Sequence, residues 1–283
     1  MALVVFASGY PLIRIALTEL PPLTVGAIRF ILASAFIIPV VIARYHDAAW
    51  KFSRRELPVL IGLSMAQIFV PNVLQNIGLE YTTASLASVL QSTTPIFTLI
   101  LAFSLLREGV GWRQVGGAVI ALSGIVMLST GGNLGNLSGS QFLGNLLQIG
   151  VAASYGVSGI VGKALLRDHP PLVVVASTFV GGGIMLAICS ISFERSSWPS
   201  GVSMTVLVVL LLLSLLYCLG LGFWYIVLQR TGVFRLYALL FLMPVLAVII
   251  SAAVLAESFT LLDVIFSGVT LLGVGITEFG KKV

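Results

Sequence analysis

Charged residues are scarce in this chain. Asp, Glu, Lys and Arg make up 9% of its 283 residues, whereas about a quarter of the residues in an ordinary soluble domain are charged. Hydrophobic residues account for 58% of the chain, and the mean hydropathy is +1.11. A water-soluble fold of this length could not bury so much apolar surface. The composition therefore excludes a soluble globular protein and indicates an integral membrane protein, whose solvent is bilayer hydrocarbon.

Cysteine and histidine are also rare, with two residues of each type. Cys189 and Cys218 lie inside apolar segments, so we expect them to be reduced, buried and structural. His46 and His169 stand alone between apolar segments, and each is predicted to be a solvated loop residue rather than a metal ligand. No glycine-rich phosphate-binding loop ending in Gly-Lys-Ser or Gly-Lys-Thr occurs. We therefore expect no metal, no cofactor and no ATP hydrolysis by this chain.

Long apolar segments dominate what is present. A spanning helix needs roughly 20 apolar residues, and about ten segments of the chain meet this requirement. The first is predicted to be a span rather than a signal peptide, because it has no basic leader and no small-residue cleavage site. The sequence thus predicts an all-α integral membrane protein with ten transmembrane helices. The predicted helices cover residues 2–18, 24–43, 57–77, 83–105, 111–129, 142–164, 172–191, 204–228, 234–254 and 261–279.

The second half of the chain repeats the first at a constant offset of 149 residues. Pro21-Pro22-Leu23 returns as Pro170-Pro171-Leu172, and four further pairs follow: Arg14 and Lys163, Pro95 and Pro244, Glu108 and Glu257, Gly124 and Gly273. We expect residues 1–130 to form a first five-helix repeat, 131–141 a linker outside the cell, and 142–283 a second five-helix repeat. A duplicated apolar chain indicates a transporter with its site between the halves.

Basic residues gather at alternate ends of the predicted helices. The opposite ends carry a single loop arginine, Arg195, so the positive-inside rule places both termini in the cytoplasm and the protein in the cytoplasmic membrane. The net charge of +5 is thereby explained by topology and contact with anionic membrane lipids rather than by nucleic-acid binding. The residues on the predicted cytoplasmic side are Arg44, Lys51, Arg54, Arg55, Arg107, Arg113, Lys163, Arg167, Arg230, Arg235, Lys281 and Lys282.

The charges also give the relative orientation of the halves. Five helices per half is an odd number, so the second half must enter the membrane in the opposite sense. Basic positions should then disappear at the offset of 149, and they do: Arg107 corresponds to Ala256, and Arg230 corresponds to Tyr81. The sequence predicts two inverted five-helix repeats.

One residue pattern joins the fourth span to the fifth in both halves. In the first half it comprises Thr94, Pro95, Glu108, Val115, Leu122 and Gly124, and in the second half Met243, Pro244, Glu257, Val264, Leu271 and Gly273. This doubled pattern resembles the drug/metabolite transporter superfamily, in particular its EamA-type members, over nearly the whole chain. The resemblance implies secondary transport, often the export of amino acids or other small metabolites.

Polar residues follow helical spacing in the third and fourth spans. At the offset of 149, Gln75 corresponds to Trp224 and Ser88 to Tyr237, so a polar stripe in one half corresponds to an aromatic stripe in the other. A central cavity with one polar and one aromatic wall would suit a small amphipathic solute. The alternative is that these side chains only pack helices together. The candidate substrate-binding residues are Tyr10, Arg29, Gln75, Ser88, Gln91, Tyr155, Trp224, Tyr237 and Phe241.

Intramembrane charge is confined to a few basic residues. Arg14 and Lys163 lie near helix ends, where such side chains usually reach the headgroups, whereas Arg29 lies further inside its span and is the better candidate for a substrate carboxylate. No acidic residue lies near a predicted midplane, so proton coupling through a central carboxylate has no support, although a coupling ion such as H+ stays open. Pro95 and Pro244 are candidate hinges for rocking, with a static kink as the alternative.

Two other classes of function stay open. A multispanning membrane enzyme acting on a lipid or prenyl substrate would need paired carboxylates or a nucleophile with its base near the membrane face, and the ten acidic residues all lie at helix ends or in loops. A membrane scaffold would transport nothing. The leading hypothesis is a secondary transporter, not an enzyme, that exports one small solute, an amino acid or related compound, by alternating access.

Overall fold

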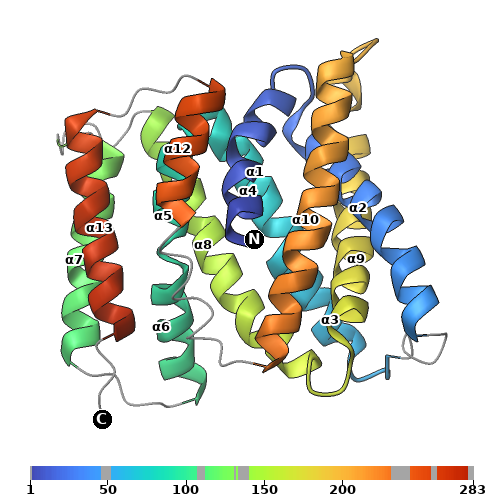
Figure 1. Cartoon of the computed structure of the whole chain (residues 1–283), viewed down its shortest axis with the longest axis horizontal. Helices are drawn as coiled ribbons and strands as arrows, with labels where there is room; N and C mark the ends of the chain where they lie inside the picture. The colour runs from blue at the N-terminus through green and yellow to red at the C-terminus, as the bar shows by residue number, and fades with distance from the viewer. Residues whose placement is uncertain are drawn as a thin grey trace.

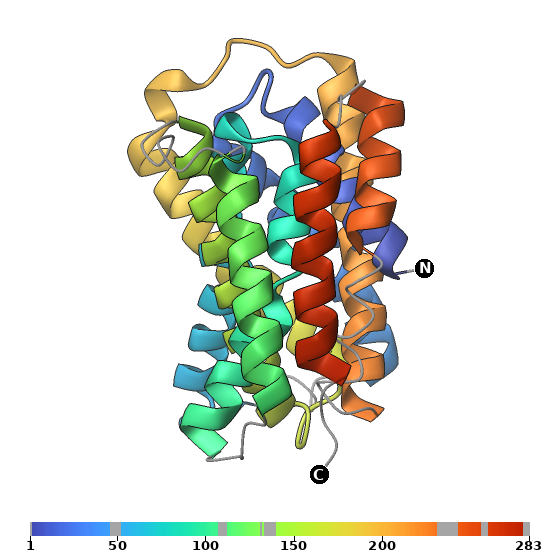
Figure 2. The ribbon, with the colours of Figure 1, turned by 90° about the vertical axis from the view of Figure 1, so that its left-hand side faces the viewer.

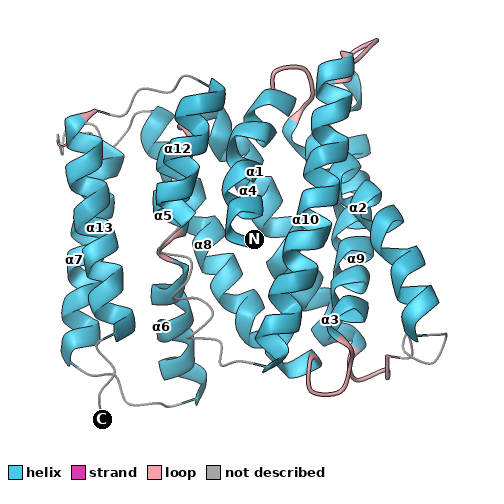
Figure 3. Cartoon of the chain, in the orientation of Figure 1, coloured by secondary structure: helices cyan, strands magenta, loops and turns pink. Residues whose placement is uncertain are grey.

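The computed structural model describes residues 2–45, 52–106, 112–130, 132, 140–230, 243–255 and 260–279. Helices make up nearly all of this part of the chain, and it contains no strand (Figure 3). Four of its segments are long and apolar enough to cross a membrane: Pro22–Tyr45, Leu57–Tyr81, Pro171–Phe193 and Met204–Arg230. The protein is therefore an all-helical membrane protein.

The first half contributes a succession of helices (Figure 1). They are α1 (Ala2–Ala16), α2 (Pro22–Tyr45), α3 (Leu57–Ser64), the π-helical turn η2 (Met65–Phe69), α4 (Val70–Tyr81), α5 (Ala84–Gln91), α6 (Thr94–Leu106) and α7 (Trp112–Thr130). The second half contributes α8 (Ser140–Leu165), α9 (Pro171–Phe193), the 3-10 turn η4 (Arg195–Ser197), α10 (Met204–Arg230), α12 (Met243–Leu255) and α13 (Leu261–Phe279). Each α-helix coincides with a span predicted from the sequence or with part of one. Residues 234–242 of the ninth predicted span lie outside the described residues.

Two corresponding helices, one from each half, begin with the same residue type. Pro22 begins α2 and Pro171 begins α9, and a proline in the first turn leaves no hydrogen bond unmade because the first N–H groups of a helix have no partner within it. These two helices correspond at the 149-residue offset, and they pack against each other in the structure.

The packing pairs elements from the two halves. α7 lies beside α13 at one end of the molecule (Figures 1 and 2), and α1 contacts both α10 and α12 while α8 contacts both α4 and α6. Gly124 on α7 and Gly273 on α13 lie at the crossing of those two helices. A Cβ atom at Gly124 would stand 2.5 Å from the hydroxyl oxygen of Thr270, and one at Gly273 would overlap the backbone of Ala121. The repeated glycines therefore allow the helices to approach closely.

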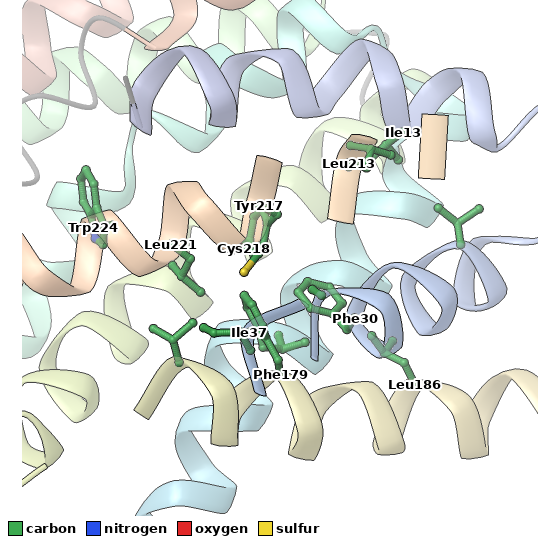
Figure 4. Packing of buried hydrophobic residues seen from close by; sticks show 14 of the residues in the cluster. Ile13, Phe30, Ile37, Phe179, Leu186, Leu213, Tyr217, Cys218, Leu221 and Trp224 are labelled. Carbon is green, nitrogen blue, oxygen red and sulfur yellow. The ribbon is translucent and has the colours of Figure 1, made fainter. Parts of the chain in front are cut away.

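The largest buried cluster joins α1, α2, α9 and α10. Phe30, Phe179 and Tyr217 meet at its centre, with ring centroids 5.4 to 6.0 Å apart (Figure 4). Only about half of each long span is buried. Large apolar side chains such as Val119 and Leu272 face outward, as expected for helices whose outer surface contacts lipid.

The fourth predicted span, residues 83–105, is interrupted next to Pro95, where the sequence predicts a hinge or a static kink. α5 ends at Gln91 and α6 begins at Thr94. Pro95 has no N–H to donate to the Gln91 carbonyl four residues earlier, and the Thr94 hydroxyl donates to that oxygen instead, at 2.7 Å. Ser92 and Thr93 likewise donate to the carbonyls three residues before them, at 2.6 Å each. Hydroxyl groups thus satisfy the backbone at the break, as buried membrane backbone requires.

Two expectations about ionisable residues were wrong. His169 is not solvated: its side chain is 10% exposed, its Nε2 lies 2.9 Å from a Glu56 carboxylate oxygen, and its ring lies against Phe52. The reason is that the turn before α9 folds onto the turn before α3. Cys218 is buried, but Cys189 is partly exposed on α9; both thiols are free. His46 lies outside the described residues.

Candidate functional site

A cavity of about 80 Å³ lies where helices from both halves converge. One water molecule needs roughly 10–15 Å³ on the same measure, so the cavity is large enough for several waters or for the core of a small solute. Its polar lining is Arg29, Gln67, Gln75, Gln91 and Thr94. Its aromatic lining is Phe6, Tyr10, Tyr155, Tyr217 and Trp224. Gly9, Ile13, Leu221 and Met243 complete the wall.

The structure brings six of the nine predicted binding residues to this cavity: Tyr10, Arg29, Gln75, Gln91, Tyr155 and Trp224. Ser88 is buried but does not line it, because its short hydroxyl donates to the Ser85 carbonyl at 2.6 Å within the same helix. Tyr237 and Phe241 lie outside the described residues. The described polar wall therefore consists of three glutamines, an arginine and a threonine rather than of serines.

A chain of hydrogen bonds crosses four helices on the polar side. The Tyr10 hydroxyl donates to Gln91 Oε1 at 2.8 Å, and Gln91 Nε2 donates to Gln148 Oε1 at 2.7 Å. Gln148 Nε2 in turn donates to the backbone carbonyl of Gln75 at 3.2 Å. All four residues are buried. Since α1, α4, α5 and α8 supply them, the network connects the first half to the second at the edge of the cavity.

Arg29 brings a positive charge into the protein interior. Its side chain is 3% exposed, its guanidinium carbon lies 4.1 Å from the centre of the Tyr217 ring, and Nη1 donates to Asn72 Oδ1 at 3.4 Å. Its Nε is buried without a hydrogen-bond partner. The centre of the Phe30 ring lies 5.2 Å from the same guanidinium carbon. Arginine stays protonated in proteins, so the described contacts of the cation are two aromatic rings and one long hydrogen bond.

The aromatic side of the cavity is one face of α10. Tyr217, Leu221 and Trp224 follow one another at spacings of four and three residues, which places them on the same side of a helix. Phe6 of α1 packs against both aromatic rings, with centroids 5.8 Å from each. Figure 4 shows Tyr217, Leu221 and Trp224 along α10.

Tyr217 and Gln67 line the cavity but are not among the binding residues predicted from the sequence. Tyr217 lies in a nearly uniform apolar stretch, and the available signal is its helical spacing from Trp224. Gln67 lies in η2, one turn before Pro71. Pro71 cannot donate to the Gln67 carbonyl, and such π-helical turns are frequent at functional sites.

The structure describes the residues on both sides of the candidate hinge Pro95, but only part of those around the candidate hinge Pro244. Pro95 is buried beside the break between α5 and α6, and Thr94 next to it lines the cavity. Pro244 is the second residue of α12, and the residues before Met243 lie outside the described residues.

The basic repeat partners Arg14 and Lys163 do not line the cavity. Lys163 Nζ donates to the Leu228 carbonyl at 2.6 Å, at the end of α10. Arg14 Nη1 donates to the Thr82 carbonyl at 3.3 Å, at the end of α4. A cation at a helix C-terminus satisfies free carbonyls and opposes the helix dipole, so these two residues stabilise helix ends.

Within the part of the chain that the structure describes, no cluster of His, Cys, Asp or Glu could hold a metal ion. The described cavity lining also contains no carboxylate and no cysteine. A cavity of mixed polarity between apolar helices of both halves is typical of a membrane transporter. The EamA-like transporter family model matches the chain in two stretches, residues 1–130 and 142–279, and the chain belongs to this family.

Curated relatives support the same class. An uncharacterized transporter of Archaeoglobus fulgidus is 28% identical over 268 residues, which cover 95% of this chain and 92% of that protein. A probable amino-acid metabolite efflux pump of Salmonella typhimurium is 24% identical and covers 100% of this chain and 94% of its own length. A probable terminal-alkyne amino-acid exporter of Streptantibioticus cattleyicolor is 25% identical over 91% of this chain and 84% of its own.

One solved crystal structure shows the same fold, with a TM-score of 0.68 over 98% of this chain and 96% of that chain, at 21% sequence identity.

Proposed function

We propose that this protein is a secondary transporter that carries one small amphipathic metabolite across the cytoplasmic membrane by alternating access. The solute, an amino acid or a related compound, binds in the cavity between two inverted five-helix repeats, residues 1–130 and 142–283, and is exported. The observation that carries the proposal is the cavity itself, because the first half supplies its described polar wall and both halves supply its aromatic wall.

Paired contacts support the inverted repeat. α2 packs on α9 and α7 packs on α13, and in each pair the members correspond at the offset of 149 residues. Arg14 stabilises the end of α4 as Lys163 stabilises the end of α10, and these elements also correspond. Equivalent contacts in both halves are expected when two copies of one unit face each other across a pseudo-two-fold axis.

The names of the relatives support the class of solute and the direction. An efflux pump for amino-acid metabolites and an exporter of a terminal-alkyne amino acid are both similar to this chain over most of its length. A membrane enzyme is less well supported, because the described cavity lining offers neither a carboxylate nor a nucleophile with its base.

The test is solute flux through purified protein in proteoliposomes, with a panel of labelled amino acids and their metabolites. Trp224→Ala, which removes part of the aromatic wall, should lower kcat/KM for the transported solute about tenfold, the equivalent of roughly 1.4 kcal/mol. Trp112→Ala is the matched control, because Trp112 is 79% exposed on α7, and it should transport normally.

Movement of no member of the panel would count against transport. Equal kinetics for Trp224→Ala and Trp112→Ala would count against this cavity as the binding site. Tyr237→Ala is expected to behave as Trp224→Ala does.

A further inference from the structure

The charge of Arg29 has no counter-ion among the described residues. The side chains that pack on its guanidinium are the aromatic rings of Tyr217 and Phe30, and a phenol is ordinarily neutral at pH 7. No described carboxylate forms an ion pair with Arg29, and Glu56 with His169 is a separate pair at the membrane edge. The segment 231–242, which precedes Met243 in the cavity wall, contains no acidic residue in its sequence.

A buried cation without a counter-ion is unfavourable unless a ligand supplies the opposite charge. Arg29 lines the cavity, its Nε has no partner, and its one described hydrogen bond is 3.4 Å long. The Tyr217 ring lies near the guanidinium carbon, and among the N–H donors of the guanidinium only Nη1 has a described hydrogen-bond acceptor. Those donors form the fork that binds a carboxylate through two parallel hydrogen bonds.

The described cavity wall contains no carboxylate that could pair with an ammonium ion. Its acceptors are neutral, and Gln91 Oε1 already accepts a hydrogen bond from Tyr10. The Thr94 hydroxyl donates to the Gln91 carbonyl, and Gln67 Oε1 faces the Tyr225 hydroxyl at 3.5 Å. An ammonium group would therefore lose its hydration and gain no charged partner.

We infer that the ligand of this cavity is a small organic acid with a net negative charge, whose carboxylate binds Arg29 and whose apolar body lies against Phe6, Leu221 and Trp224. This inference rests on the proposed function for the location of the site, and it narrows the solute class. Among amino-acid derivatives it selects those without a free ammonium group, such as 2-oxo acids, over the zwitterions.

The test is ligand binding, measured as the shift of the thermal unfolding midpoint of the purified full-length protein. The probes share one phenyl ring and differ in charge: phenylpyruvate is an anion, L-phenylalanine a zwitterion and 2-phenylethylamine a cation. A leucine-derived set with a smaller body is 4-methyl-2-oxopentanoate, L-leucine and 3-methylbutylamine. A ligand that binds only the folded state raises the midpoint, so at least one oxo acid should raise it, its zwitterion should raise it less, and its amine should not.

Arg29→Gln should weaken binding of the oxo acid about 10- to 100-fold, the range expected for losing hydrogen bonds to a charged group. Arg29→Lys keeps the charge without the planar fork, so its affinity for the oxo acid should lie between those of the wild type and Arg29→Gln. Arg44→Gln is the matched control, because Arg44 lies at the exposed end of the same helix, and its affinity should match the wild type.

Three results overturn the inference: an amine or zwitterion that binds as tightly as its oxo acid, an unchanged affinity in Arg29→Gln, or no stabilisation by either oxo acid. Even if Arg29→Gln does not fold, the probe series on the wild-type protein still tests whether the cavity prefers an anion to a zwitterion or a cation. An oxo acid that binds through Arg29 but does not cross proteoliposome membranes contradicts the proposed function alone. Transport of a neutral or cationic solute without need of Arg29 contradicts this inference alone.

Discussion

Single carboxylates outside the membrane spans tie neighbouring turns together. Glu194, which follows α9, accepts hydrogen bonds from the Leu23 and Thr24 backbone N–H groups at 2.8 and 2.7 Å, at the start of α2. Glu56, which precedes α3, accepts from the Ser53 N–H at 2.6 Å and lies 2.9 Å from His169 Nε2. A carboxylate at free N–H groups satisfies donors that have no partner within the helix.

Glu56 gives a pH-dependent prediction. Hydrogen bonds from Ser53 first, and then the contact with His169, lower the pKa of Glu56 from its ordinary value to about 2. A carboxyl whose folded-state pKa is lowered stabilises the protein fully above its unfolded-state pKa, and that stabilisation is lost as the pH falls toward the folded-state value. In thermal unfolding scans, wild type should therefore exceed Glu56→Ala by a margin that shrinks between about pH 5 and pH 3. A margin that stays constant over this range would show that ionised Glu56 does not stabilise the fold.

At the scale of helices, the sequence predicts the positions of the described helices well and their interruptions less well. Helix positions follow from apolar length, and Pro22 and Pro171 mark the starts of α2 and α9. The sequence also identifies Pro95 as a point where a helix is kinked or hinged, and α5 and α6 are separated next to it. It does not show that η2 adopts π-helical geometry, because that geometry depends on packing: Gly182 of α9 lies directly against Ile68.

The α7–α13 pair allows a matched test of close packing. Gly273→Ala should lower stability by about 1–3 kcal/mol, because the new methyl group would overlap the backbone of Ala121, which cannot move aside as a side chain can. Gly275→Ala on the same helix meets nothing within 4 Å, and it should be neutral or slightly stabilising because alanine favours helix by up to about 1 kcal/mol. Unfolding midpoints in detergent measure both. Similar midpoints for the two variants would contradict the close crossing.

At the scale of the whole molecule, residues that correspond in the sequence repeat meet at the cavity but differ in chemistry. Gln75 and Trp224 correspond at the offset of 149, and both line the cavity. The sequence predicts most of the polar and aromatic lining because such residues stand out in apolar helices. It cannot predict that Ser88 bonds within its own helix or that Tyr217 covers Arg29, because both follow from side-chain directions set by tertiary packing.

Cysteine labelling tests the predicted orientation. In a background without Cys189 and Cys218, a cysteine at the exposed position Ser53 should react with a membrane-impermeant thiol reagent only from the cytoplasmic side. One at the exposed position Ser200, in the turn between α9 and α10, should react only from outside. The reverse pattern, or labelling of both from one side, would overturn the topology.

The central claim is that a single cavity between the halves opens to each side of the membrane in turn. Gly9 lines that cavity, and a Cβ atom there meets nothing within 4 Å, so Gly9→Cys can report access without disturbing the packing. Gly62→Cys is the control, at an exposed position on the outer surface of α3. Because that surface is expected to contact lipid, which an impermeant reagent does not enter, this cysteine should stay unmodified. In the cysteine-free background, we expect an impermeant thiol reagent to modify Gly9→Cys in both right-side-out and inverted vesicles. Modification from one side only, or from neither, would contradict alternating access through this cavity.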